Sequence, residues 1–401
     1  SILFLFTWRI KNYAWKYLVF AGVAAGLAAS VKYNGFLTVI ILGLLVPFCL
    51  NNENKRVFNI LKTIGVYAGT ALIISSPWLI KNYVQTGNPV YPLYNGIFNK
   101  DIQEISPLDK KFYLKKKQSP FWVRKNIYKE NFLSIITVPL RIFFQGKDDN
   151  PQLFDGSLNP FLLIFPLCFF ALPLLFKEIS VDFEFLFLFL FSFVYILFVF
   201  FLTNMRVRYI SPILPCLTLC TVSFLYALFE NVLRKRYTVL LISAILFFTF
   251  LPNFLYLNNL WARVSPGKYL SGKVSRDEYI SIRRPEYPLI KFLNESSDPE
   301  SKILALYLGN RRYYFKRDVR FRNDLFLYIL DKSGDVDYLK EKIQSLGFTH
   351  LIIRHDLFNE RINNLSLDRQ KLCKRFFQEK LFLLNQNSPY ALYRFKSGKY
   401  R

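Results

Sequence analysis

Residues 75–96 read SSPWLIKNYVQTGNPVYPLYNG and mark the point at which an apolar helix leaves a membrane. The apolar run before this point, residues 58–78, is close to the roughly 20 residues that cross a bilayer core. Trp78 suits the membrane–water interface, where tryptophan is enriched. Pro89 and Pro92 interrupt both helices and central strands. We therefore expect an ordered loop at the membrane surface from residue 79 onward.

The distribution of apolar residues predicts two domains. The chain has 401 residues, of which 52% are hydrophobic, and its mean hydropathy is +0.21. Apolar runs dominate residues 1–257, which predicts a multi-pass α-helical membrane domain with a long external loop at 79–158. Residues 258–401 have the pattern of a small α/β domain. The apolar runs predict an initial helical stub at 1–6 and seven helices, at 17–30, 36–50, 58–78, 159–176, 183–203, 209–228 and 238–257.

Two features of the membrane domain leave alternatives open. The first two runs are short, so they represent either short helices or longer tilted helices that meet at the tight hairpin VKYNG (31–35). Residues 121–144 alternate apolar with basic side chains. This second pattern fits an interfacial helix lying flat on the membrane or a segment packed against the helix bundle.

The net charge of +25 indicates that the protein binds an anionic partner, either a membrane surface or a nucleic acid. Lys and Arg collect in cytoplasmic loops and beside anionic headgroups, and the basic runs contain no motif for binding DNA or RNA. A lipid bilayer is therefore the expected partner, and nucleic acid is not. The five cysteines show neither a disulfide framework nor a zinc spacing. We expect no metal and no cofactor.

Short basic loops set the expected orientation of the helices. They lie at 9–16, 55–62 and 234–236, and the positive-inside rule assigns them to the cytoplasm. Alternation of the spans then places the hairpin around Lys32, the loop 79–158, the connection 204–209 and the C-terminal domain on the external face. The lysine-rich run 110–117 is compatible with this placement, because long loops are largely exempt from the rule.

The C-terminal domain contains several recognisable elements. A strand is predicted at 302–308, and apolar residues at helical spacing predict a helix that Asp335 caps and Gly347 terminates. Further strands are predicted at 350–353, 382–384 and 391–395, the last two paired antiparallel across NQNSP. His350 and His355 flank the strand LIIR. For both, a surface or strand-end position is favoured over a catalytic or metal-binding role.

Three cationic sites fall at helix ends on the expected external face: Lys32, Lys81, and the pair Arg206 and Arg208. An unpaired ammonium at membrane depth costs about 2.5–3.5 kcal/mol, so Lys32 needs compensation. Phosphate oxygens would supply it for all three sites, and guanidinium groups suit bidentate contacts with phosphate. The alternative is that these side chains anchor at the interface. If the helices are neighbours, the cations converge.

The acidic residues of the external loop show no catalytic pair. Asp155 precedes a predicted helix and is expected to cap or orient its start. The remaining carboxylates are predicted to serve solvation; they are Asp101, Glu104, Asp148 and Asp149. The sequence contains no glycine-rich phosphate loop, Ser/His/Asp set or metal-binding box.

Four segments carry a resemblance to a known family: AGVAAGLAASVKYNGFL (21–37), SPWLIKNYVQTGNPVYP (76–92), FDGSLNPFLLIFPL (154–167) and RVRYISPILP (206–215). In this order, separated by apolar spans, they make residues 1–257 resemble the C-terminal part of a GT-C membrane glycosyltransferase of the protein-mannosyltransferase and aminoarabinose-transferase type. The C-terminal domain matches only the general plan of an external domain after the last helix.

The resemblance implies an activity and a location. A sugar would be transferred, with inversion, from a polyprenyl-phosphate carrier to a lipid, glycan or protein acceptor on the external face. The expected location is the inner (plasma) membrane of a bacterium. Family members place the acidic base in their first external loop. Because the chain starts with what looks like the tail of a helix, we expect that loop, and the catalytic residue, upstream of Ser1.

The resemblance also implies two sets of site residues. The first binds the donor phosphate and consists of Lys32, Lys81, Arg206 and Arg208. The second forms a substrate pocket and consists of Tyr33, Asn82, Asn88, Tyr91, Asp155 and Tyr209.

Two other classes of protein remain as alternatives. A transporter or lipid-linked-sugar flippase without transferase activity would usually show internal repeats and ionisable residues within its spans, whereas the charges here lie mainly at the ends of the apolar runs. A noncatalytic membrane scaffold with an external binding domain is the other. An upstream first loop without an acidic pair would favour the scaffold.

Overall fold

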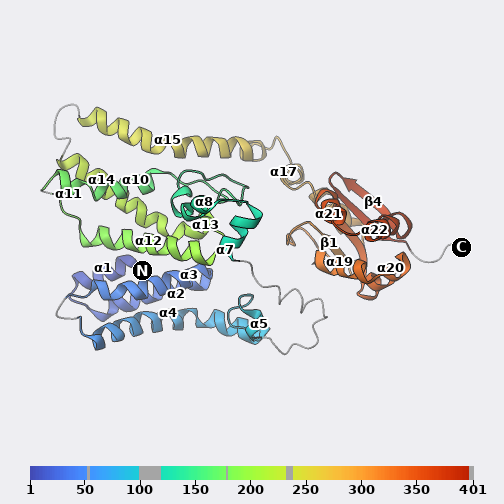
Figure 1. The fold of residues 1–401 in the computed structure, drawn as a ribbon, viewed down its shortest axis with the longest axis horizontal. Coiled ribbons are helices and arrows are strands. Elements are labelled where there is room, and N and C mark those ends of the chain that lie inside the picture. Colours follow the sequence, from blue (N-terminus) through green and yellow to red (C-terminus); the bar gives the residue numbers. More distant parts are fainter. Residues whose placement is uncertain (52–54, 99–118, 178, 232–237, 397–401) are drawn as a thin grey trace. The chain divides into compact units, whose positions relative to one another are not determined.

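The structure is a computed structural model that describes residues 1–51, 55–98, 119–177, 179–231 and 238–396. The chain divides between Leu260 and Trp261 into a helical unit and a C-terminal α/β unit (Figure 1). Several residues used in the sequence predictions lie outside the described residues; they are Asp101, Glu104 and the basic runs at 110–117 and 234–236.

The helical unit contains long and short helices. The longer ones are α1 (Ile2–Ile10), α2 (Trp15–Val31), α3 (Asn34–Leu45), α4 (Val57–Thr86), α10 (Phe161–Phe169), α12 (Phe183–Leu202), α14 (Leu214–Asn231) and α15 (Thr238–Val264), which runs past the unit boundary. The shorter ones are η1 (Val46–Cys49), α5 (Asn95–Phe98), α7 (Pro120–Trp122), η3 (Val123–Ile127), α8 (Phe132–Ile136), α9 (Val138–Arg141), α11 (Leu172–Leu175), α13 (Val207–Ile210) and η4 (Ser211–Ile213).

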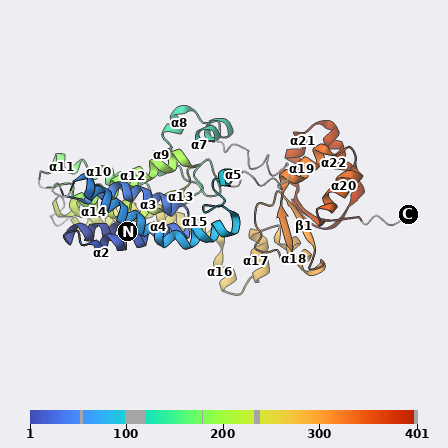
Figure 2. The ribbon, with the colours of Figure 1, turned by 90° about the horizontal axis from the view of Figure 1, so that it is seen from below.

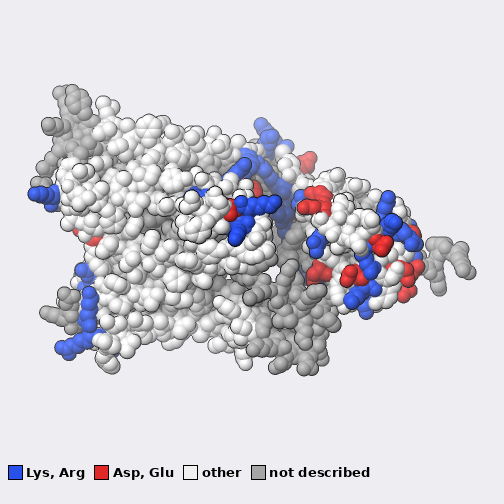
Figure 3. All heavy atoms as spheres, in the orientation of Figure 1, with Lys and Arg blue, Asp and Glu red and all other residues white. Residues whose placement is uncertain are grey.

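Within the described residues, four helical segments are long and apolar enough to cross a membrane: Val57–Thr86, Phe183–Leu202, Val207–Glu230 and Leu240–Val264. The other three predicted spans also form apolar helices, but these are shorter, at Trp15–Val31, Asn34–Cys49 and Phe161–Leu175. The visible face of the helical unit is nearly free of charged side chains along its long helices, and Lys and Arg gather at the helix ends (Figure 3). A hydrocarbon core requires such a surface.

Small residues let α2 and α4 pack closely. A Cβ atom added to Gly22 would lie 2.7 Å from the Tyr67 carbonyl oxygen, and one added to Gly26 would lie 2.5 Å from that of Ala71. This is the close approach that small residues four apart allow between membrane helices. The helix α2 also contacts α1 and α3, while α12 contacts both α3 and α14 (Figure 1).

The helix α4 continues through the expected loop start at residue 79 and ends at Thr86. Pro77 lies inside it without ending it. The helix stops at Gly87, whose φ of 68° is left-handed and whose N–H donates to the Tyr83 carbonyl. Glycine adopts this conformation without steric cost. The loop start predicted at residue 79 is therefore wrong by about two helical turns.

A single interfacial helix over residues 121–144 is wrong. The segment breaks into α7, η3, α8 and α9, and the Asn131 side chain accepts a hydrogen bond from the Ser134 N–H to start α8. Val138, Ile142 and Phe143 are buried in the core of the helical unit. Figure 2 shows α7 and α8 beside the long helices, and α7 and α9 both contact α12. The segment therefore packs against the helix bundle, which was the second interpretation of its sequence.

The α/β unit is built on a five-stranded sheet of order β2-β1-β3-β5-β4. Its strands are β1 (Lys302–Leu306), β2 (Asp318–Phe321), β3 (Phe348–Arg354), β4 (Leu381–Asn387) and β5 (Tyr390–Phe395); β1 pairs in parallel with β2 and β3, and β5 pairs antiparallel with β3 and β4. Its helices are α16 (Pro266–Leu270), α17 (Arg276–Arg283), α18 (Tyr287–Ser296), α19 (Asn323–Lys332), α20 (Val336–Ser345), α21 (His355–Asn363) and α22 (Leu367–Lys380).

The sequence predictions for this unit are confirmed at the level of elements. Strands form at the predicted positions, including the antiparallel β4–β5 hairpin. The Asp335 side chain caps α20 by accepting a hydrogen bond from the Tyr338 N–H, and Gly347 follows the helix with a φ of 86°. Two hydrophobic cores form, one around Phe326 under α19, α20 and α22, the other around Leu289 of α18.

The surface or strand-end position expected for His350 is wrong, because this residue is buried within β3. His355 directly follows β3, at the strand end that was expected. His350 lies in β3 with 7% of its surface exposed, and its Nδ1 is 2.9 Å from the Thr349 hydroxyl. The Nε2 atom of His355 is 2.9 Å from the Tyr393 hydroxyl. Over the part of the chain that the structure describes, no group of His, Cys, Asp or Glu side chains is placed to hold a metal ion.

Candidate functional site

An apolar cavity of about 500 Å³ opens among α1, α2, α3, α12 and the start of α14. Most of its wall is hydrophobic, formed by residues such as Ala28, Leu42, Leu188, Phe191 and Leu219. The polar residues that line it are Ser1, Lys32, Asn34, Thr38, Arg208 and Ser211. None of the described lining residues is a carboxylate. The cavity thus joins hydrophobic walls to two cations.

The two cations reach the cavity from separate parts of the chain. Lys32 follows the last turn of α2 with an extended backbone, and Arg208 lies in the short helix α13. The Lys32 ammonium lies 5.8 Å from the Tyr209 ring centroid, and the Arg208 guanidinium lies 5.3 Å from it. Attraction between cations and the face of an aromatic ring is effective over about 6 Å. The positive charges of Lys32 and Arg208 therefore both lie close to the Tyr209 ring.

Arg206 is paired with Asp155. Its guanidinium donates to the Asp155 carboxylate at 3.1 Å, and Arg208 lies 3.9 Å from the same carboxylate. The loop carrying Asp155 is held against α13 because the Val207 N–H donates to the Phe154 carbonyl. Of the two arginines, Arg208 lines the cavity and Arg206 does not.

Asp155 is expected to cap or to orient the start of α10, and of these two roles capping is wrong. That role belongs to Asn159, whose side-chain oxygen accepts the Phe161 N–H at the start of α10. Asp155 instead turns toward Arg206, because its own loop is bound to α13 rather than to α10.

Tyr33, Asn82 and Tyr91 connect the hairpin after α2 to the end of α4. The Tyr33 hydroxyl donates to the Tyr91 carbonyl, and the Asn82 amide donates to the Tyr33 hydroxyl at 3.0 Å and to the Pro89 carbonyl at 3.3 Å. These contacts fix the chain beside Lys32. They also tie the turn at residues 88–92 to the hairpin.

Lys81 and Asn88 take other positions. The Lys81 ammonium lies 5.3 Å from the Trp78 ring, and Lys81 is not among the residues that line the cavity. Asn88 is fully buried; its amide donates to the Leu93 carbonyl and its oxygen accepts the Val90 N–H. The structure therefore brings Lys32, Arg208 and Tyr209 together. It places Lys81 within α4 and Asn88 in the turn after that helix, and neither lines the cavity.

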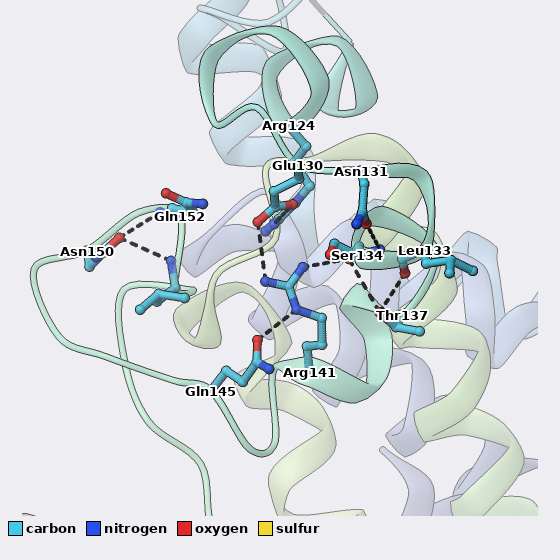
Figure 4. A network of polar contacts seen from close by, with 11 residues as sticks. Arg124, Glu130, Asn131, Leu133, Ser134, Thr137, Arg141, Gln145, Asn150 and Gln152 are labelled. Atoms are coloured by element: carbon cyan, nitrogen blue, oxygen red, sulfur yellow. Dashed lines mark hydrogen bonds and ion pairs between the residues drawn. The ribbon is translucent and has the colours of Figure 1, made fainter.

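A buried ionic network supports this region and was not predicted. Glu130, with 5% of its side chain exposed, accepts from Arg124 at 2.8 Å and from Arg141 at 3.3 Å (Figure 4). Both guanidinium groups also lie near the ring of Phe154, at 5.1 and 5.9 Å. The network therefore holds Phe154, the residue directly before Asp155.

The comparisons with known proteins give no family assignment. No protein-family model matches the chain, and no curated protein matches it.

Proposed function

We propose that the protein is a membrane glycosyltransferase of GT-C-like architecture that uses a polyprenyl-phosphate-linked sugar as donor. The single observation that carries the proposal is the meeting of Lys32 and Arg208 at one apolar cavity. A polyprenyl-phosphate sugar combines an apolar chain with a phosphate, so the cavity walls and the two cations match its two parts.

The cavity's charges fit the chemistry of the leaving group. In the transfer, the acceptor hydroxyl oxygen bonds to the anomeric carbon while the bond from that carbon to the phosphate oxygen breaks. The electron pair leaves with the polyprenyl phosphate, whose negative charge increases. Cations fixed in a water-poor site stabilise such developing charge. Lys32 and Arg208 are the residues that we assign to this role.

The hydroxyl proton must pass to a base, and we assign that role to no described residue. The Asp155 carboxylate lies 3.9 Å from Arg208, but it is already hydrogen-bonded to Arg206. Its contacts support a role in positioning the two arginines. The acceptor would be a lipid, glycan or protein hydroxyl on the external face of a bacterial inner membrane.

The proposal is tested with the complete gene product in lipid nanodiscs and radiolabelled polyprenyl-phosphate sugars. Lys32→Gln and Arg208→Gln should each lower the transfer rate by about tenfold or more, because a hydrogen bond to a charged group contributes about 1.5–3 kcal/mol. Arg375→Gln, an exposed site on α22, serves as the charge-matched control and should retain activity.

Normal transfer in both cavity variants would remove this cavity from the mechanism. Translocation of the donor lipid across the bilayer without sugar transfer would replace the proposal with a flippase.

A further inference from the structure

A second hollow lies at the end of the membrane-spanning helix α15. Its volume is about 240 Å³, and its lining comes from the last residues of α15 and from α16 and α17. Three of the lining residues are cations, Arg263, Lys268 and Arg283. No carboxylate is among its described lining residues, which are otherwise Val264, Ser265, Val274, Tyr279 and Ile282. We call this hollow the juxtamembrane pocket.

Local contacts hold the pocket in shape. Ser265 has a left-handed backbone with a φ of 49°, and the chain reverses there into α16. The Tyr279 hydroxyl of α17 donates to the Val264 carbonyl at 2.9 Å. The Val274 N–H donates to the Lys268 carbonyl, and the rings of Tyr269 and Tyr279 stack 5.4 Å apart. The cations are therefore carried on a braced backbone.

The nearest carboxylates in sequence are directed to other partners. Asp277 accepts from Lys291 at 2.5 Å and from the Tyr287 hydroxyl at 2.7 Å, and these bonds hold the pKa of Asp277 below its ordinary value. Glu278 forms a capping box with Ser275, and hydrogen bonding with the side chain and the backbone N–H of Ser275 lowers the pKa of Glu278 as well. Asp277 and Glu278 therefore bind residues that do not line the pocket.

The pocket's surroundings are those of a membrane surface. The segment Leu240–Val264 is one of the four described spans, so the pocket begins where this span ends. Large apolar side chains around it are exposed: Trp261 by 60%, Leu270 by 75% and Ile282 by 67%. Exposed tryptophan and aliphatic side chains mixed with Arg and Lys are typical of segments that lie at the headgroup level.

We propose that the juxtamembrane pocket binds the phosphate of an anionic membrane phospholipid. Arg263, Lys268 and Arg283 would contact the headgroup phosphate, while Trp261, Leu270 and Ile282 contact the upper acyl region. A free phosphate ion offers the same charge but no apolar part, so the exposed side chains favour the lipid. The site is separate from the donor cavity and does not depend on the proposed transferase activity.

Native mass spectrometry of the full chain in detergent, titrated with phosphatidylglycerol or phosphatidylcholine, tests this proposal. The wild type should bind phosphatidylglycerol more tightly. The variant Arg263→Gln/Lys268→Gln/Arg283→Gln should lose about tenfold or more in affinity for it, since each basic residue near an anionic lipid surface contributes measurably. The control Lys371→Gln/Lys374→Gln/Arg375→Gln removes the same charge from the exposed face of α22 and should bind like the wild type.

A second variant separates loss of charge from loss of fold. Arg263→Lys/Arg283→Lys keeps the charges and should retain the preference for phosphatidylglycerol. Equal phosphatidylglycerol affinity in the wild type and the triple Gln variant would overturn the proposal, as would equal affinity of the wild type for the two lipids. Displacement of phosphatidylglycerol by inorganic phosphate at comparable concentration would show a site for soluble anions and would also overturn it.

Discussion

The carboxylate of Asp155 accepts a hydrogen bond of 3.1 Å from the guanidinium of Arg206, 51 residues further along the chain. This pair joins the loop that contains Asp155 to α13, the helix that carries Arg208 to the cavity. Each partner has about a quarter of its side chain exposed, 23% for Asp155 and 26% for Arg206. Because most of both side chains is shielded from solvent, this ion pair can hold α13, and with it Arg208, in position.

We predict that Asp155 and Arg206 are energetically coupled. Asp155→Asn, Arg206→Gln and the double variant form a double-mutant cycle, and thermal unfolding in detergent provides the readout. The expected coupling is about 1 kcal/mol, in the range found for residues in contact. Additive effects of the two single substitutions would show that the pair does not hold the loop to α13.

Glu130→Ala should destabilise the helical unit strongly. The substitution leaves Arg124, with 4% of its side chain exposed, as a buried charge without its carboxylate. Breaking a buried ion pair in this way costs about 3–5 kcal/mol. Glu184→Ala is the control, because its pair with Arg9 is 3.7 Å long and exposed, and it should cost about 1 kcal/mol or less. Equal losses in the two variants would refute the structural role of the network.

Gly26→Ala should loosen the packing of α2 on α4. The new methyl group would lie 2.5 Å from the Ala71 carbonyl oxygen, so backbone must shift, at a cost of about 1–3 kcal/mol. Gly65→Ala is the matched control, because nothing lies within 4 Å of the added Cβ. There, the higher helix propensity of alanine should stabilise α4 by up to about 1 kcal/mol. Melting temperatures should therefore move in opposite directions, and a shared direction would contradict the described packing.

The α/β unit should lose stability as the pH falls below about 6.5. Burial lowers the pKa of His350 and of His355 from the ordinary value of 6.5. The unfolded chain then takes up protons before the folded one does, so the stabilisation is complete above the unfolded pKa and is lost as the pH falls toward the folded values.

Hydrogen exchange of β3 amides in the whole protein measures this effect. Protection, corrected for intrinsic exchange rates, should fall between about pH 7.5 and about pH 5.5. In His350→Gln/His355→Gln the fall should be much smaller. A fall of the same size in that variant would assign the pH dependence to other groups.

The sequence predicts elements better than it predicts which of them meet. The cap at Asp335, the stop at Gly347 and the β4–β5 hairpin follow from local backbone chemistry, and the structure has them. Local rules also misplace the end of α4, because a proline such as Pro77 is tolerated in a membrane helix where neighbours satisfy the backbone.

The long-range contacts of the site could not be read from spacing alone. Asp155 precedes a helix in sequence, yet its partner is Arg206, which the folding of the loop onto α13 brings near. One feature of the sequence could have predicted the ionic network around Glu130. Glu130 is the only acidic residue between Asp109 and Asp148 in a strongly basic stretch, which favours a paired carboxylate.

We propose that Lys32 and Arg208 bind the phosphate of an isoprenoid lipid in the cavity that they line. The most direct test of this proposal is the dissociation constant of a short polyprenyl phosphate, measured against the matching polyprenol that lacks the phosphate. The phosphate should bind more tightly to the wild type, and Lys32→Gln/Arg208→Gln should weaken it by about tenfold or more. Lys81→Gln, a change outside the cavity lining, should leave the constant within about twofold. An unchanged constant in the Lys32→Gln/Arg208→Gln variant, or equal binding of the alcohol and the phosphate, would contradict the account.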